Sequence, residues 1–538
     1  MTQNQRAPGG SRPRPSTSHP QAASPTGTRW LALAVLCVTV LVVNLDNTVL
    51  NVALPTLVRD LNATSSDLQW IVDAYIIVYA GLLLAAGGLA DRIGRKKTFL
   101  AGLAIFAGCS AWAAFSGDVS TLIAARASMG VGGALMIPST LSIISNMFRD
   151  PAERQRAIAL WGGTSGLGLA LGPIIGGVLL SRFWWGSIFL INVPIAAIGL
   201  IAAFFVVPDS KNANAQAPDL LGAVLSIASI GMILWSIIEA PTRGWSSAPV
   251  IAVGAAGLAT LAIFAAWERF TDHPLLNLGF FRQRSFSAAI LSVATVTFGL
   301  FGALFMLTQF MQFFLGYTPL QAGIRVLPAA TALVVLAPLS ALLVRTIGTK
   351  LTMAAGLALI AAGLWQISGA TVTTTFAGTV LGMVLLGTGA GLAMPTATGS
   401  VIGSVPETDS GVASATNATA IQFGGALGVA VVGSLLDTRY QDKMASALAG
   451  QHVPHTVMAT VTNSLGGALT VAARAGGTTG ILLTHLARAA FVSGMDLGLL
   501  TGSVVAIAGC LLVLAWLPAR PGAAPAPGRR SGRPAPRS

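Results

Sequence analysis

The chain has 538 residues, of which 54% are hydrophobic and only 9% are charged. A soluble globular protein carries about 25% charged residues, so this composition indicates an integral membrane protein without a soluble domain. The net charge of +13 would suit nucleic-acid binding, but most Lys and Arg residues fall in the termini and in alternate loops, where they report membrane topology instead.

Fourteen apolar segments reach the length of about 20 residues that a membrane-spanning helix needs. They lie at 30–51, 69–89, 98–116, 121–146, 157–180, 187–207, 219–240, 248–267, 286–314, 322–344, 351–370, 377–402, 411–436 and 495–517. The distribution of basic residues predicts that both termini are cytoplasmic. The abundance of Ala, Gly and Arg favours a bacterial source, and therefore a multi-pass protein of the bacterial cytoplasmic membrane.

The spans divide the chain into two six-helix halves with two helices between them. The predicted parts are a disordered tail at 1–28, the first half at 29–207, two linking helices at 208–270, the second half at 271–517 with an external loop at 437–494, and a disordered tail at 518–538. The first tail is rich in Pro, Ser, Gln and Gly, and it lacks the apolar core of a signal peptide.

Asp46 is the one acid inside the first span, 30–51. A carboxylate in hydrocarbon is unfavourable and marks a functional site by default. Because burial disfavours the ionised form, such a group can take a proton from one side and release it to the other. A structural alternative stays open, in which Asp46 bonds to nearby Asn side chains or a backbone amide and holds a helix break before Pro55.

Asp73 and Arg126 lie at a similar depth to Asp46, in the second and fourth spans. A buried Arg needs an acceptor, and Asp46 and Asp73 are the acids within reach of Arg126. The alternative is that Arg126 extends to the outer interface or bonds to backbone carbonyls. Asp73 is predicted to be a second proton site or an attraction point for cationic substrate, unless it is simply interfacial.

A glycine-rich basic loop, 87–97, joins the second and third spans. Its candidate gate residues are Gly87, Asp91, Arg92, Gly94 and Arg95. Glycine permits a tight turn, and an acid at this position can cap a helix or pair with an Arg to hold one conformation closed. The alternative is a basic loop that only fixes topology.

The fifth span, 157–180, carries a stripe of small residues for close helix packing. Its members are Gly168, Gly172, Gly176 and Gly177, with Pro173 bending the helix between them. We expect this segment to act as a hinge, although packing alone would also explain the stripe.

Spans 2–5 recur as spans 10–13, which indicates an internal repeat in parallel orientation. The recurring pairs include Gly94 and Gly348, Thr98 and Thr352, Gly102 and Gly356, Gly130 and Gly387, and Gly132 and Gly389. The positions that differ are Asp91 against Arg345, Arg126 against Met383, and Pro173 against Ala430. Because these polar and kinking residues occur only in the first half, we expect the coupling chemistry there.

Six polar residues are candidates for substrate binding: Asn44, Glu239, Gln309, Gln312, Asn417 and Gln422. Gln309 and Gln312 share one helix face, where they would line a cavity. The alternative is hydrogen bonding between helices, or simple solvation for Glu239. No phosphate loop, zinc spacing or nucleophile elbow is present, so neither an enzyme nor a cofactor or metal site is expected. The three His residues of 437–494 are expected to be solvated.

Several stretches resemble motifs of the fourteen-span drug:proton antiporters of the major facilitator superfamily. They are 46–55 in the first span, 87–97 between spans 2 and 3, 126–130 in the fourth span, 168–177 in the fifth, 185–194, and 316–323. The resemblance covers about residues 30–517. Met129, Gly186 and Ile421 depart from the pattern.

The resemblance implies multidrug efflux, the export of small lipophilic compounds driven by proton entry. It makes Asp46 the embedded acid, Arg126 its partner, Asp91 a gate residue, and Gly172 and Pro173 the hinge. The partners would be a small-molecule substrate, protons and the lipid bilayer, and a monomer would suffice. Alternatives are a dedicated exporter of a compound that the cell makes, a nutrient importer, and a sensor that transports nothing.

Overall fold

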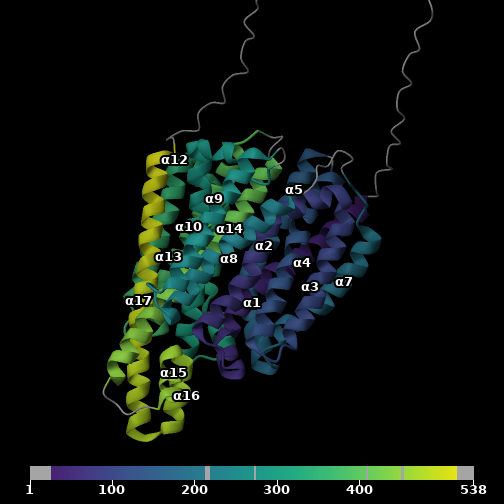
Figure 1. The fold of residues 1–538 in the computed structure, drawn as a ribbon. Helices are drawn as coiled ribbons and strands as arrows, with labels where there is room; N and C mark the ends of the chain where they lie inside the picture. The colour runs from purple at the N-terminus through teal and green to yellow at the C-terminus, as the bar shows by residue number, and fades with distance from the viewer. Residues whose placement is uncertain are drawn as a thin grey trace, which may run out of the picture.

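The computed structural model describes residues 26–148, 150–211, 219–271, 274–406, 410–449 and 454–517, and within these ranges every regular element is helical (Figure 1). This agrees with the predicted all-α membrane fold. A helix satisfies its backbone hydrogen bonds internally, which is what a chain crossing hydrocarbon requires.

The described part of the first half forms one helix after another with short connections. Its helices are α1 (Thr26–Leu61), α2 (Ser65–Ile93), α3 (Arg95–Ala114), α4 (Val119–Met147), α5 (Pro151–Arg182), the short α6 (Ser187–Leu190) and α7 (Asn192–Val206). Short polar side chains set the starts: Thr64 and Asp67 form a capping box at α2, and Asp118 caps α4.

The remaining elements begin with α8 (Leu220–Arg243) and α9 (Ala248–Phe270), which correspond to the two linking helices. They are followed by the turn η1 (Leu278–Arg282), α10 (Arg284–Gln309), the π-helical turn η2 (Phe310–Phe314), α11 (Pro319–Arg325), α12 (Leu327–Ser368), α13 (Phe376–Gly403), α14 (Ser410–Leu448), α15 (His455–Asn463), α16 (Leu465–Ala475) and α17 (Gly477–Trp516).

All fourteen predicted spans are helical, but the boundaries between the helices differ from the predicted boundaries between the spans. Within the described residues, twelve helices are long and apolar enough to cross a membrane. One of them, Pro319–Ser368, contains two predicted spans that are separated at Gly348, whose φ of 85° interrupts the helical backbone. Of α5, only Leu171–Arg182 qualifies, as a shorter apolar helix. The count of fourteen crossings therefore stays a prediction.

The prediction that residues 437–494 form a loop is wrong for the described part of that segment, which is mostly helical, whereas its external location stays a prediction. α14 continues to Leu448, α17 begins at Gly477, and α15 and α16 form a helical hairpin between them. The segment is rich in Ala, a strong helix former, and it buries side chains: the Tyr440 hydroxyl of α14 donates to the Val461 carbonyl of α15 at 3.0 Å. A helix break before Pro55 is also wrong, because α1 continues through it to Leu61.

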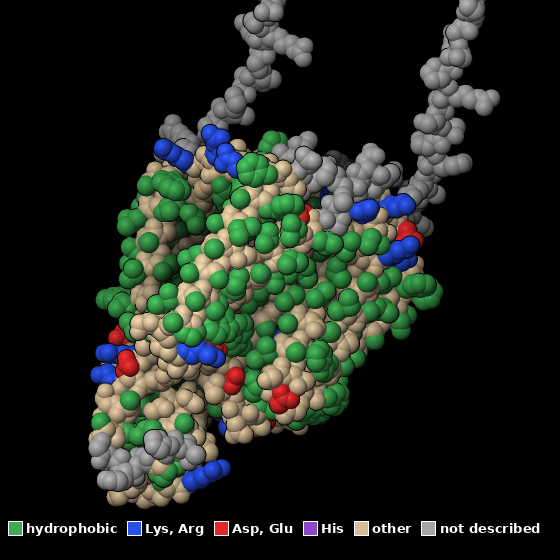
Figure 2. Space-filling view, in the orientation of Figure 1, with side chains coloured by type: hydrophobic (Ala, Val, Ile, Leu, Met, Phe, Trp, Pro, Cys, Tyr) green, Lys and Arg blue, Asp and Glu red, His purple; other side chains and the backbone are tan. Residues whose placement is uncertain are grey.

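The bundle has two distinct ends. The α15–α16 hairpin lies at one end, which we call the hairpin face, and the start of α1 and the end of α17 lie at the other, the terminal face (Figure 1). On the face shown in Figure 2, many hydrophobic side chains are exposed between the two ends, and Ile198, Phe205 and Leu258 are at least 63% exposed. A continuous exposed apolar surface of this kind suits contact with lipid.

The predicted repeat is present in the packing of the two halves. A Cβ on Gly102 of α3 would lie 2.8 Å from the Gly132 carbonyl oxygen of α4, and a Cβ on Gly356 would lie 2.7 Å from the Gly389 carbonyl oxygen. The connecting glycine has a positive φ in both halves, 123° at Gly94 and 85° at Gly348. Glycine adopts such a φ without steric penalty.

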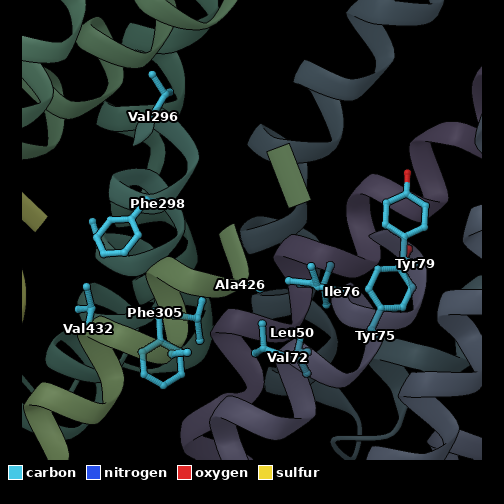
Figure 3. Packing of buried hydrophobic residues seen from close by; sticks show 14 of the residues in the cluster. Leu50, Val72, Tyr75, Ile76, Tyr79, Val296, Phe298, Phe305, Ala426 and Val432 are labelled. Atoms are coloured by element: carbon cyan, nitrogen blue, oxygen red, sulfur yellow. The ribbon is translucent and has the colours of Figure 1, made fainter. Parts of the chain in front are cut away.

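The two halves meet through apolar side chains of α1 and α2 on one side and α10 and α14 on the other, as Leu50, Ile76, Phe305 and Ala426 show (Figure 3). Toward the hairpin face the contact is closer: the side chain of Gln69 lies 2.8 Å from where a Cβ on Gly433 would be. Near the terminal face, a Cβ on Gly162, Gly163, Gly399 or Gly403 would meet no atom within 4 Å.

Candidate functional site

An ion pair between Asp46 of α1 and Arg126 of α4 lies inside the first half. Only 3% of Asp46 and 1% of Arg126 is exposed. The Arg126 Nη1 donates to Asp46 Oδ2, and its Nε donates to the Ile71 carbonyl of α2 at 3.1 Å. The predicted pairing is therefore present, with Asp46 rather than Asp73 as the acceptor.

Asn192 of α7 completes the surroundings of the carboxylate. Its Nδ2 lies 3.0 Å from Asp46 Oδ1 and 3.4 Å from the Ser110 hydroxyl of α3. A buried ion pair is tolerated only when further hydrogen bonds satisfy its remaining polar atoms, and Asn192 occupies the oxygen that Arg126 leaves free. The site thus draws on α1, α2, α3, α4 and α7.

Aromatic rings enclose the cation. The Arg126 guanidinium carbon lies 4.5 Å from the ring centroid of Tyr75 and 5.9 Å from that of Phe189. The negative face of an aromatic ring attracts a cation, more strongly when both are removed from water. Tyr75, on the α2 turn after Ile71, therefore helps to hold Arg126 in place.

The glycine stripe of α5 packs against α1 on both sides of Asp46. A Cβ would lie 2.7 Å from Asn44 Cβ at Gly168, and 2.8 Å from Thr48 Cβ at Gly172. The Thr48 hydroxyl also donates to the Gly168 carbonyl at 3.1 Å. Any larger residue in the stripe would push α1, and with it Asp46, away from its present position.

The same part of α5 contacts the second half through α11. Gly323 of α11 approaches the Pro173 carbonyl oxygen so closely that a Cβ on Gly323 would overlap it. A Cβ on Gly177 would lie 2.5 Å from Leu320 Cα. α5 therefore touches both the helix that carries Asp46 and a helix of the second half, which is the arrangement that a hinge between the two would use.

Asp73 of α2 is fully buried, and among the described residues neither of its carboxylate oxygens receives a hydrogen bond. An unpaired buried carboxylate is strongly disfavoured, so Asp73 stays the predicted second proton site. Its position one turn after Gln69, which bonds to α14, places it on the α2 face toward the second half.

The residues predicted as a gate form a compact turn at the terminal face. Arg95 Nε donates to Asp91 Oδ1 at 2.8 Å, and Arg95 Nη1 donates to the Ser142 carbonyl of α4 at 3.3 Å. Gly94 needs its glycine for a φ of 123°, whereas a Cβ on Gly87 would make an ordinary 3.7 Å contact. Arg92 is exposed. Every contact described here for this turn lies within the first half.

The candidate substrate residues do not gather at one point. Asn44 donates to the Val40 carbonyl of its own helix at 2.9 Å, and Gln309 to Phe305 at 3.4 Å. Gln312, displaced from Gln309 by the π-helical turn, instead donates across the interface to the Val52 carbonyl of α1 at 2.8 Å. Gln312 thus makes the hydrogen bond between helices that was the predicted alternative, and its role in substrate binding stays a prediction.

The other candidates also bond between helices. Asn417 of α14 lies 3.4 Å from the Thr398 hydroxyl of α13, and Gln422 of α14 lies against the Tyr79 hydroxyl of α2. Glu239 of α8 accepts from the Trp70 indole of α2 at 3.3 Å and pairs with Arg243 at 3.0 Å, so simple solvation does not describe it.

Sequence reasoning missed two buried polar residues, one in the ion-pair site and one between the two halves. Asn192 lies in the stretch 185–194 that resembles the antiporter motifs, and an amide inside an apolar span is a signal of the same kind as the acid Asp46. The second is Asp437 of α14, which is 5% exposed and accepts from Gln69 at 3.0 Å. It was missed because the predicted span ended at 436.

Comparison with known proteins identifies the family to which this chain belongs. The profile of the Major Facilitator Superfamily matches residues 36–429. The chain belongs to the Major Facilitator Superfamily. Members of this superfamily are multi-pass membrane transporters, so the glycine frame and the two halves described above are those of a transporter rather than an enzyme.

Individual relatives of this superfamily member span nearly its full length. It is 36% identical over 486 residues to the multidrug efflux pump LfrA of Mycolicibacterium smegmatis, covering 90% of this chain and 94% of that one. It is 32% identical over 509 residues to the tetracenomycin C resistance and export protein of Streptomyces glaucescens, covering 94% of each.

Among solved structures, a bacterial homologue of the human lysosomal transporter Spinster, in an inward-facing and unoccupied conformation, matches with a TM-score of 0.65. The sequences are 17% identical, and the match covers 93% of this chain and 100% of that one. At that identity the match shows a shared fold.

Proposed function

We propose that this superfamily member is a proton-coupled exporter of small lipophilic drugs or antibiotics, working by alternating access. The observation that carries the proposal is the enclosed Asp46–Arg126–Asn192 cluster, which is a titratable acid held inside the membrane. The similarity of the chain, along nearly its whole length, to a protein named as a multidrug efflux pump supports export rather than uptake.

The terminal face is assigned to the cytoplasm by the distribution of basic residues. Blue Lys and Arg side chains near that face are visible in Figure 2. With this orientation, the close contacts at Gln69, Gly177 and Gly323 shut the external side. The conformation is then the one that receives substrate from the cytoplasm or the inner leaflet.

Proton arrival at Asp46 would neutralise the carboxylate and weaken its attraction to Arg126. Arg126 keeps its bond to the Ile71 carbonyl and its contact with Tyr75, so α1 rather than α4 is free to shift. The glycine stripe of α5 packs against α1 and also contacts α11. A shift of α1 would therefore be transmitted through α5 to the second half.

The membrane potential supplies about 2.3 kcal/mol per charge per 100 mV, so each entering proton can drive export of substrate against a gradient. Asp73 is proposed as a second acid that shares the proton or meets a cationic substrate. Substrate and proton would then compete either for an acid or for the conformation that the acid controls.

Dye efflux from energised bacterial cells tests this proposal. Cells that express the wild type should extrude ethidium until a protonophore collapses the gradient, and Asp46→Asn should abolish extrusion while the protein stays in the membrane. Asp118→Asn is a matched control, since Asp118 is an acid that caps α4 outside its apolar part. Undiminished efflux by Asp46→Asn would remove the acid from the mechanism.

A dedicated exporter of a compound that the cell itself makes is the second candidate. It is favoured by the 32% identity to a protein named for both resistance to and export of tetracenomycin C. Efflux assays with a panel of cationic and neutral compounds separate the two: a broad profile supports multidrug export, and a single transported compound supports the dedicated exporter.

A further inference from the structure

A long groove lies on the outside of the second half, where α12 and α13 lie side by side. Its volume is about 820 Å³, within the range of about 300–1,000 Å³ typical of small-molecule sites. Apart from Arg325 and two threonines, its lining is apolar. Val335 is 54% exposed and Val384 36%, so the groove opens onto the apolar surface that faces lipid.

One end of the groove carries a cation. The Arg325 guanidinium carbon lies 3.9 Å from the ring centroid of Tyr317 and 5.4 Å from that of Phe376, and Nη1 donates to the Gln321 carbonyl at 3.2 Å. None of the ion pairs among the described residues includes Arg325. Its positive charge is therefore fixed in place and is not neutralised by a described carboxylate.

The groove has the height of one membrane leaflet. Its lining on α11 and α12 extends from Ile324 to Leu336, which at 1.5 Å per residue is roughly 18 Å. Half of the hydrocarbon core of a bilayer is about 15 Å. Arg325 and Phe376, the first residue of α13, mark the end toward the hairpin face, where lipid headgroups would lie.

We propose that this groove binds a membrane phospholipid with a negatively charged headgroup. The phosphate meets the Arg325 guanidinium, which can bind phosphate oxygens in a bidentate manner, and an acyl chain lies along α12 and α13. Basic residues near a membrane surface attract anionic lipids, and aromatic residues such as Tyr317 are enriched at that depth.

The position of the groove links this lipid to the contact between the halves. Arg325 belongs to α11, and two residues earlier Gly323 sits on the Pro173 carbonyl of α5. A lipid that holds α11 in place thus supports the closed hairpin face. The binding site itself does not depend on what the transporter carries.

Native mass spectrometry of the full-length, delipidated protein tests the headgroup. Titration with dioleoyl phosphatidylglycerol should show one tight site on the wild type, about five-fold weaker in Arg325→Gln, since one basic residue contributes about that factor. Binding of dioleoyl phosphatidylcholine should change little. Arg439→Gln is the matched control, because Arg439 is an exposed Arg of α14 that contacts Ser493 and does not line the groove.

A second pair of variants tests the acyl chain. Thr331→Phe fills the groove without touching Arg325 and should remove the tight phosphatidylglycerol site, whereas Val334→Phe, an exposed neighbour outside the lining, should leave it intact. Unchanged lipid binding in both Arg325→Gln and Thr331→Phe would overturn the proposal. So would a Thr331→Phe variant that loses ethidium binding and keeps the lipid, because the groove would then belong to substrate.

Discussion

The two halves share one backbone frame and differ in what they bury inside it. Gly130 packs on the Tyr75 carbonyl and Gly387 on the Ala329 carbonyl, so Tyr75 and Ala329 are equivalent positions. Where the first half has Arg126, 1% exposed, the second has Met383, fully buried. The helix packing therefore does not require the charges. Because the ion pair occurs in only one of two equally packed halves, packing alone does not explain it.

Arg126→Met makes the first half like the second and should have the largest effect. It leaves the Asp46 carboxylate buried without its cation, which is expected to destabilise the protein by about 3–5 kcal/mol. Thermal unfolding in detergent should show a markedly lower midpoint, and dye efflux should be lost. A stable Arg126→Met variant that still exports dye would contradict the distinction between the halves.

The double variant Asp46→Asn with Arg126→Met refines that comparison. It removes both charges together, so most of the lost stability should return while efflux stays absent. If the double variant is as unstable as Arg126→Met alone, the loss arises from the packing of Arg126 against Tyr75 and not from the unpaired acid.

Asn192→Leu removes the second hydrogen bond to Asp46 and should have an intermediate effect. A hydrogen bond to a charged group contributes about 1.5–3 kcal/mol, so the unfolding midpoint should fall and the pH dependence of efflux should shift. Asn417→Leu is the control in the second half, where the side chain meets a neutral hydroxyl. Equal changes in the pH profile for both variants would argue against a special role for Asn192.

Gly102→Ala and Gly356→Ala test the shared frame itself. Each added Cβ would lie 2.8 or 2.7 Å from a backbone carbonyl oxygen of the neighbouring helix, so each should destabilise by about 1–3 kcal/mol. The two decreases in unfolding midpoint should be similar. A large effect in one half with none in the other would show that the halves do not share equivalent packing.

Gln312→Leu should have the smallest effect. It removes one neutral hydrogen bond between the halves, from Gln312 Nε2 to the Val52 carbonyl, worth about 0.5–1.5 kcal/mol. Because this bond joins the two halves, we expect its loss to weaken their closure toward the hairpin face, so accessibility labelling of an engineered Cys on that side should increase. Unchanged labelling would exclude the bond from the closure.

Local patterns in the sequence predicted much of this molecule. The apolar segments predicted the helices. The positions of Asp46 and Arg126 along the first and fourth spans predicted that they lie at a similar depth in the membrane. The repeat was visible because glycine is required wherever backbones touch, as at Gly132 and Gly389. These features depend on spacing along a helix, which the sequence records directly.

The parts that could not be predicted depend on contacts between distant segments. The bond from Gln69 to Asp437 joins residues 368 positions apart, and the sequence around Asp437 does not indicate that partner. Likewise, the close contact of Gly323 with the Pro173 carbonyl oxygen depends on how the two halves pack together. The helical hairpin at α15 and α16 was taken for a loop because its short helices lack the length of a membrane span.

The central claim is that neutralisation of Asp46 couples protons to transport, and proton flux in liposomes tests it most directly. Purified wild type in liposomes with a trapped pH indicator should move protons when ethidium is added. Asp46→Asn, shown to be folded by retained ethidium binding, should move none. Full ethidium-dependent proton flux by Asp46→Asn would contradict the account.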